Sequence, residues 1–136
     1  MKRTVRNEIG EVTVREDCIV HARVFSGAEI HLKEAYDYHS MVAYLSKNEP
    51  HVTVLDITGL KYISKESREF LSKNSDEWGK TIAVAFIINS FTARIVANFF
   101  LTVNKPSYPI KTFTDPLLAQ QWAKNEYYKF SVRVAS

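Results

Sequence analysis

Two short apolar segments, residues 52–57 and 81–88, constrain the fold more than any other part of this sequence. Their texts, VTVLDI and TIAVAFII, are rich in β-branched residues and are bounded by turn or loop residues. Runs of this kind are typical of strands that are covered on both faces, as in a parallel sheet. Parallel neighbours need a long crossover between them, and a segment with helical character separates the two runs.

The other segments continue this alternation of strands and helices. Residues 11–25 predict a β-hairpin that turns at Glu16–Asp17, and residues 110–113 predict a third short strand. Helices are predicted over four ranges: 31–48, 64–78, 91–103 and 114–125. We therefore expect an α/β fold with a mostly parallel sheet, alternating helices and an N-terminal β-hairpin.

The C-terminal tail predicts one more strand. Its apolar and polar residues alternate and give it one apolar face: Phe130, Val132 and Val134 against Lys129, Ser131 and Arg133. This C-terminal strand is expected to pair with the N-terminal hairpin or with a second chain, which would make a homodimer. The 136 residues are expected to form one domain, with residues 1–8 and 125–136 as peripheral extensions.

The helix predicted over residues 91–103 is apolar nearly all round, and Arg94 is its only charge. A helix of this kind is expected to be buried, either within its own domain or against a partner. It cannot continue into Pro106, so the segment from Lys105 to Pro109 is expected to be a stiff, extended crossover back to the sheet.

Composition and spacing argue against several classes of function. The net charge of +3 is spread along the chain without a block of like charges, so no nucleic-acid partner is expected. The longest apolar run is too short to span a bilayer, so we expect no stable membrane insertion and a cytoplasmic location. With four glycines, no phosphate-binding loop, no nucleophile elbow and no metal-ligand spacing, we expect no cofactor, no metal and no catalysis.

The segment VLDITGLKYISKESREFL, residues 54–71, resembles the signature region of bacterial anti-sigma-factor antagonists, the STAS or SpoIIAA-like superfamily. There an apolar strand ends in Asp, and a glycine turn leads to a helix that opens with a regulatory serine. The matching residues here are Asp56, Gly59 and Ser64 to Ser67. The resemblance implies a SpoIIAA-like sheet and a regulatory module that binds another protein. Lys65 stands where the phosphorylated serine of the antagonists falls, and Ser67 replaces their glycine.

A later stretch is similar to a stand-alone bacterial branch of the same superfamily that has no settled activity. That branch typically shows an Asn-Phe-Phe helix, a Lys/Arg-Pro-x-x-Pro crossover and a Phe-Thr-Asp start to a helix ending in Ala-x-x-Trp. The matching residues are Asn98, Phe99, Phe100, Lys105, Pro106, Pro109, Phe113, Thr114, Asp115, Ala119 and Trp122.

Seven residues are candidates for a binding or regulatory site: Asp56, Ser64, Ser67, Arg68, Arg94, Asn98 and Lys105. Ser64 and Ser67 are either phospho-acceptors at a helix start or ordinary capping and first-turn residues. The cations are expected near the strand-end edge, where they either hold a carboxylate or phosphate or serve the structure. In the structural alternative, Arg94 pairs with Asp56 or Glu66 and Asn98 ties down the crossover backbone.

The sequence is compatible with two functions. The first is a non-catalytic regulatory module that docks another protein around the helix start at Ser64–Arg68. The alternative is a carrier or sensor of a small lipid-like ligand beneath the helix at 91–103, with Lys105 or Arg94 contacting an anionic head. Its pocket would be lined by Phe91, Phe99, Phe100 and Tyr108, which otherwise belong to the core; lipid-carrying CRAL-TRIO domains share a distantly similar layout.

Overall fold

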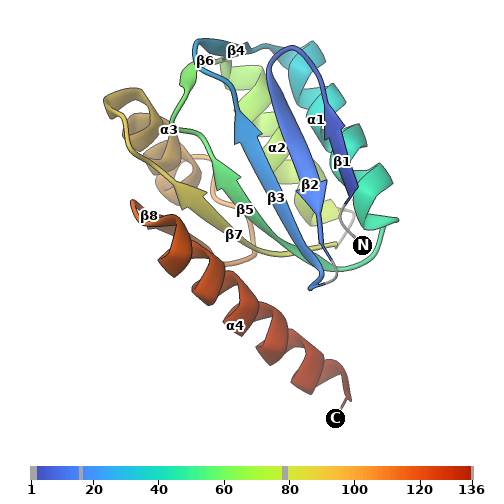
Figure 1. The fold of residues 1–136 in the computed structure, drawn as a ribbon. Coiled ribbons are helices and arrows are strands. Elements are labelled where there is room, and N and C mark those ends of the chain that lie inside the picture. Colours follow the sequence, from blue (N-terminus) through green and yellow to red (C-terminus); the bar gives the residue numbers. More distant parts are fainter. Residues whose placement is uncertain (1–2, 16, 78–79, 136) are drawn as a thin grey trace.

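A computed structural model describes residues 3–15, 17–77 and 80–135 of the chain (Figure 1). Its elements are, in order, β1 (Arg3–Arg6), β2 (Gly10–Val14), β3 (Ile19–Val24), β4 (Ala28–Ile30), α1 (Leu32–Ser46), β5 (His51–Asp56), β6 (Leu60–Ile63), α2 (Lys65–Glu77), β7 (Thr81–Ile87), α3 (Phe91–Thr102), β8 (Ile110–Phe113) and α4 (Pro116–Ala135). None of these helices combines the length and apolar character of a membrane-crossing segment.

The main sheet has the strand order β1-β2-β3-β5-β7-β8. β1 and β3 flank β2 in antiparallel orientation, whereas β3, β5, β7 and β8 run parallel to one another. The two apolar runs of the sequence form β5 and β7, which are parallel neighbours with Val54 opposite Ala85. The predicted mixed α/β fold, its parallel sheet and its N-terminal hairpin are therefore confirmed. Residues 3–6, which the sequence placed in a peripheral extension, form the edge strand β1.

Helices cover both faces of the main sheet: α1, α2 and α3 lie on one face and α4 lies on the other (Figure 1). The alternation of side chains along β5 divides the core accordingly. Val52 and Val54 pack with Ala119 and Ala123 of α4. Ile57, just beyond the strand, belongs to the core on the opposite face, together with residues of α1 and α3.

A second sheet of two parallel strands, β4 and β6, lies at the carboxyl end of the main sheet (Figure 1). No strand was predicted from the sequence over either segment, and each strand is only three or four residues long. Gly59 allows this close approach, since a Cβ atom there would lie 2.8 Å from the backbone carbon and oxygen of Phe25. The small sheet fixes Ile30 and Ile63 beneath the α1 side of the core.

Within the described chain, the helix predicted over residues 91–103 is buried on one face only, so burial of its outer face would need a partner. Its inner face packs into the core through Ala93, Val96, Ala97 and Phe100. Phe91 and Ile95, in contrast, keep 79% and 45% of their surface exposed, and Val103 keeps 69%. Small residues on one side let the helix lie close to the sheet, while the larger apolar residues extend outward. The crossover that follows agrees with the prediction, because the chain passes through buried Pro106 and enters β8 at Ile110.

The predicted C-terminal strand is also wrong, because residues 116–135 form one continuous helix, α4. Pro116 starts this helix, and Asp115 accepts a hydrogen bond of 2.9 Å from the backbone N–H of Leu117. The sequence that follows contains no glycine or proline, so the helix propagates through the alternating tail, whose β-branched residues lower helix propensity only slightly. Strand pairing through the tail, within the chain or with a second copy, therefore has no strand to use.

Candidate functional site

Ser64 and Ser67 form a buried pair at the start of α2. The Ser64 hydroxyl accepts a hydrogen bond of 3.1 Å from the backbone N–H of Ser67, which makes Ser64 the cap of this helix. The two hydroxyls are 2.7 Å apart, and Ser67 also donates to the backbone oxygen of Ile30 at 3.3 Å. Because Ser67 has no exposed surface, a modifying enzyme would reach it only after this helix start opens.

Arg68 connects the start of α2 to the end of α3. Its guanidinium lies 4.1 Å from the centroid of the Phe99 ring. It also donates hydrogen bonds to the side-chain oxygen of Asn104 at 3.2 Å and to the backbone oxygen of Ile63 at 3.3 Å. These contacts hold Arg68 in place and use its donors within the chain, so the geometry gives it a structural role.

The other predicted site residues do not join this cluster. Asp56 accepts a hydrogen bond of 2.9 Å from the backbone N–H of Thr58 and shapes the turn after β5. Arg94 and Asn98 are exposed on α3, and Lys105 is exposed in the crossover. Among the residues that the structure describes, no ion pair joins Arg94 to Asp56 or Glu66. The seven candidates thus form no single constellation; the structure brings together only Ser64, Ser67 and Arg68.

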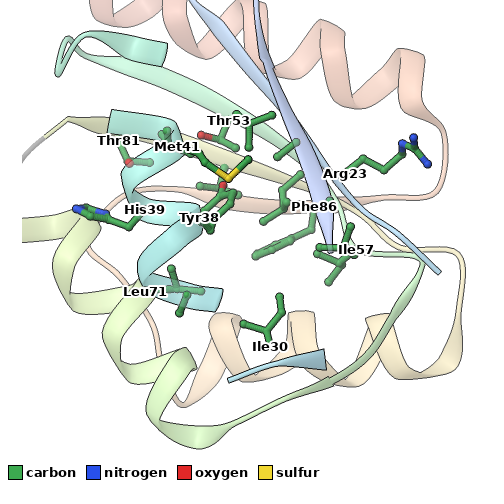
Figure 2. A pocket seen from close by; sticks show the side chains of 18 of the residues that line it. Arg23, Ile30, Tyr38, His39, Met41, Thr53, Ile57, Leu71, Thr81 and Phe86 are labelled. Atoms are coloured by element: carbon green, nitrogen blue, oxygen red, sulfur yellow. The ribbon is translucent and has the colours of Figure 1, made fainter. Parts of the chain in front are cut away.

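A cavity of about 130 Å³ lies between α1 and the sheet, on the side that also carries α2 and α3 (Figure 2). Most of its lining is apolar. The apolar lining residues include Ile30, Ile57, Leu71, Phe86, Val96 and Phe100. Of the four residues that the sequence suggested for a ligand pocket, Phe100 and Tyr108 line this space, whereas Phe91 and Phe99 do not. Lys105 and Arg94 are also absent from its lining, so the cations expected at an anionic head lie elsewhere.

Tyr38 brings a phenol group into this cavity. Figure 2 shows its ring reaching from α1 toward the sheet, beside Met41. Burial raises the pKa of the Tyr38 phenol, and the neighbouring Tyr108 adds to the rise, so the group is protonated throughout the physiological range.

His51 is the second polar group of the cavity lining. Its side chain is 5% exposed and lies between the cavity and an open depression of about 350 Å³ at the amino end of β5. The Nδ1 atom is 2.9 Å from the backbone oxygen of Glu49, and since a carbonyl only accepts, Nδ1 carries the proton. Burial lowers the pKa of His51 and the Glu49 hydrogen bond opposes this only partly, so the ring is neutral.

The charged side chains of Glu11 and Arg23 point away from the cavity, and Lys80, which also lines it, is exposed. Glu11 and Arg23 alternate along their strands with Val12 and Ala22, whose side chains belong to the core on the α1 side. Glu11 and Arg23 therefore project to the opposite face of the sheet, where they pair at 3.1 Å. Figure 2 shows Arg23 directed outward. The cavity is thus an apolar space with a few neutral polar groups, which is the usual character of a small-molecule site.

The predicted site residues did not include Tyr38, His51 or Thr53, although the sequence pattern indicates the face on which each of these side chains lies. His51 and Thr53 stand at alternate positions of an otherwise apolar strand, which places both side chains on one face. Tyr38 and Met41 are three residues apart on the apolar face of α1. No group of three or more potential metal-ligating side chains occurs in the described ranges, and the cavity contains none.

A family model described as a domain of unknown function, DUF7793, matches residues 13–127. The chain belongs to the DUF7793 family. This DUF7793 chain resembles a crystal structure from Shewanella loihica PV-4, an uncharacterised protein of the DUF3478 family with a SpoIIAA-like fold, with a TM-score of 0.58 and 18% identity. The match covers 90% of this chain and 95% of the other, and it confirms the SpoIIAA-like fold. A comparison with curated proteins finds no significant match.

Proposed function

We propose that this DUF7793 chain is a non-catalytic binding module that takes a small, mainly apolar ligand into the cavity between α1 and the sheet. The observation on which this depends is the cavity of about 130 Å³, lined by apolar side chains and a few neutral polar groups. Cores are normally packed without voids larger than a water molecule, because each void forfeits contacts. A ligand that fills the space restores those contacts.

The volume of the cavity limits the size of the ligand. An apolar cavity of roughly 150 Å³ in another protein binds benzene, whereas pockets for drug-sized molecules start at roughly 300 Å³. The cavity between α1 and the sheet is therefore suited to a ring-sized molecule and is too small for a long acyl chain. This narrows the lipid-like ligand expected from the sequence to a much smaller apolar molecule.

Benzene is a direct probe for this proposal. Titration of the protein with benzene, followed by NMR, is expected to shift the resonances of Leu71, Val96 and other cavity-lining methyl groups in a saturable manner. Val96→Phe places a ring in the cavity, so benzene binding is expected to be lost while the fold persists. Val103→Phe lies on the exposed part of the molecule and is the matched control. Absence of saturable binding to the unmodified protein would remove the proposal.

Docking of a protein partner, as in the anti-sigma-factor antagonists, is a second candidate. The observation that favours it is the exposed outer face of α3, where Phe91, Ile95 and Leu101 present apolar surface to water. This face is a better candidate for docking than the start of α2, because Ser64 and Ser67 are buried there. The expected partner is a protein with a complementary apolar groove.

A pair of variants tests the docking candidate. Ile95→Asp is expected to abolish association with a co-purifying protein, because it places a charge in the centre of the exposed face. Leu117→Asp introduces the same charge at an exposed position of α4 and is expected to leave the association intact. Retention of the partner by the Ile95 variant would count against docking through α3.

A further inference from the structure

The neutral polar groups of the cavity gather at one end. Figure 2 shows the Tyr38 hydroxyl directed toward the part of the lining where Thr53 and Thr81 lie. His51 belongs to the same end, because it stands two residues before Thr53 on β5 and its side chain projects from the same face. The opposite end is apolar, with Ile30, Ile57 and Phe86 around it (Figure 2).

Two of these polar groups, Nε2 of His51 and the Tyr38 hydroxyl, can bind the same ligand hydroxyl, because Nε2 accepts a hydrogen bond and the phenol can donate one. Since Nδ1 of His51 donates to Glu49, Nε2 has a lone pair that can only accept, and this buried atom has no partner in the described structure. The Tyr38 hydroxyl retains a proton that it can donate, as well as lone pairs. Burying an acceptor such as Nε2 of His51 without a partner costs about 1–3 kcal/mol. A ligand hydroxyl supplies both a donor for Nε2 and an acceptor for Tyr38.

The lack of a buried cation defines the ligand further. Arg94 and Lys105 are not part of the cavity lining, Arg23 points outward, and Lys80, which does line the cavity, is exposed to water. An ionised carboxylate or phosphate would lose its hydration without gaining a buried ion pair, which costs far more than burying a neutral hydroxyl. The ligand must therefore enter uncharged.

We propose that the cavity takes a neutral, ring-sized molecule with one hydroxyl group, such as a simple phenol or cyclic alcohol. The hydroxyl lies at the polar end, against Tyr38 and His51, and the hydrocarbon part lies among Ile57, Phe86 and the other apolar residues. This assignment of ligand class rests on the proposed function. It adds that the ligand is selected by hydrogen bonds as well as by its size.

Benzene tests whether the cavity binds an apolar ring, and phenol tests whether it also binds a hydroxyl group, because the two compounds differ only in that hydroxyl. Tyr38→Phe removes one oxygen atom from the cavity and keeps the ring, so the fold is expected to persist. This change is expected to weaken phenol binding about five-fold, which is the worth of a net hydrogen bond of about 1 kcal/mol. Benzene binding is expected to stay within two-fold of that of the unmodified protein. Tyr44→Phe, on the exposed side of α1, is the control and is expected to change neither affinity.

Each outcome of this titration decides one level. Saturable binding of benzene together with a selective loss of phenol affinity in Tyr38→Phe supports the assignment. If benzene binds but phenol affinity is unchanged in Tyr38→Phe, or phenol is refused by the unmodified protein, the hydroxyl assignment is overturned while the apolar site stands. If neither compound binds the unmodified protein, the proposed function and the assignment are both overturned.

Discussion

The guanidinium of Arg68 lies over the ring of Phe99 at 4.1 Å and so joins the start of α2 to the last turns of α3. Both helices contribute to the wall of the cavity, through Leu71 and Phe100 respectively. The contact therefore belongs to the framework that sets the spacing of the two helices. Of the two roles considered for the cations in the sequence, anion binding or a structural one, these contacts favour the structural role for Arg68.

Replacement of Arg68 tests this structural role. Arg68→Ala is expected to lower the free energy of unfolding by about 1–2 kcal/mol, because it removes the stacking on Phe99 and the hydrogen bonds to Asn104 and Ile63. Arg94→Ala, on the exposed face of α3, is expected to change it by less than about 0.5 kcal/mol. Urea unfolding at neutral pH measures both, and equal effects would contradict the structural assignment.

The buried serine pair gives a second prediction. Ser67→Asp is expected to destabilise the protein by about 3 kcal/mol or more, because it places a charge where no surface is exposed. Ser64→Ala removes only a helix cap and is expected to cost about 1 kcal/mol. If thermal unfolding shows Ser67→Asp to be no worse than Ser64→Ala, the helix start tolerates charge, as a phosphorylation switch at this position requires.

Filling the cavity is expected to stabilise the empty protein. Val42 belongs to the lining, and Val42→Ile adds one methylene group to this space. The free energy of unfolding is expected to rise by about 0.8 kcal/mol, the value for one buried methylene. Val103→Ile adds the same group at an exposed position and is expected to give no gain. A loss of stability in the Val42 variant would show that the space is already filled by the surrounding side chains.

Buried histidines predict a pH dependence of stability. Burial lowers the pKa of His51, His39 and His21, so the unfolded chain binds protons more readily than the folded protein. Stability is therefore fully present above the unfolded pKa of about 6.5 and is lost as the pH falls from there toward the folded pKa values. The loss is at most about 1.4 kcal/mol per pH unit for each histidine.

His51→Asn isolates one contribution to this pH dependence. The asparagine amide can replace the Nδ1 donor to Glu49 but does not titrate. The difference in unfolding free energy between pH 7.5 and 5.5 is expected to be smaller in this variant than in the unmodified protein. An equal pH dependence in the two proteins would assign the effect to other groups.

Most strands of the main sheet and the helices between them could be predicted, because the local sequence specifies each of these elements. β5 and β7 are continuous apolar runs, and the Ser90 hydroxyl caps α3 by accepting from the backbone N–H of Ala93. The C-terminal tail was predicted wrongly because its alternation from Lys129 to Val134 mimics a strand, whereas the helix begun at Pro116 continues through it. Local pattern does not show how far a helix propagates.

The candidate site could be predicted only in part, because a cavity is a property of packing between distant segments. Tyr38, Thr53 and Phe100 come from three elements, and the sequence does not show that they leave space between them. The SpoIIAA-like resemblance led to Ser64 and Ser67, which the fold uses to start a helix. Of the four aromatic residues expected to line a ligand pocket, Phe100 and Tyr108 line the cavity, and Phe91 and Phe99 do not.

Within the described chain, one face of the main sheet is covered by a single helix, α4 (Figure 1). Its alanines at 119 and 123 have no exposed surface and lie against Val52, Val54 and Ala85. Because the other helices lie on the opposite face of the sheet (Figure 1), the detachment of α4 leaves them in place. Such detachment would uncover a continuous hydrocarbon patch on parallel strands. Native-state proteolysis and self-association of this protein are therefore both expected to begin with the release of its last helix.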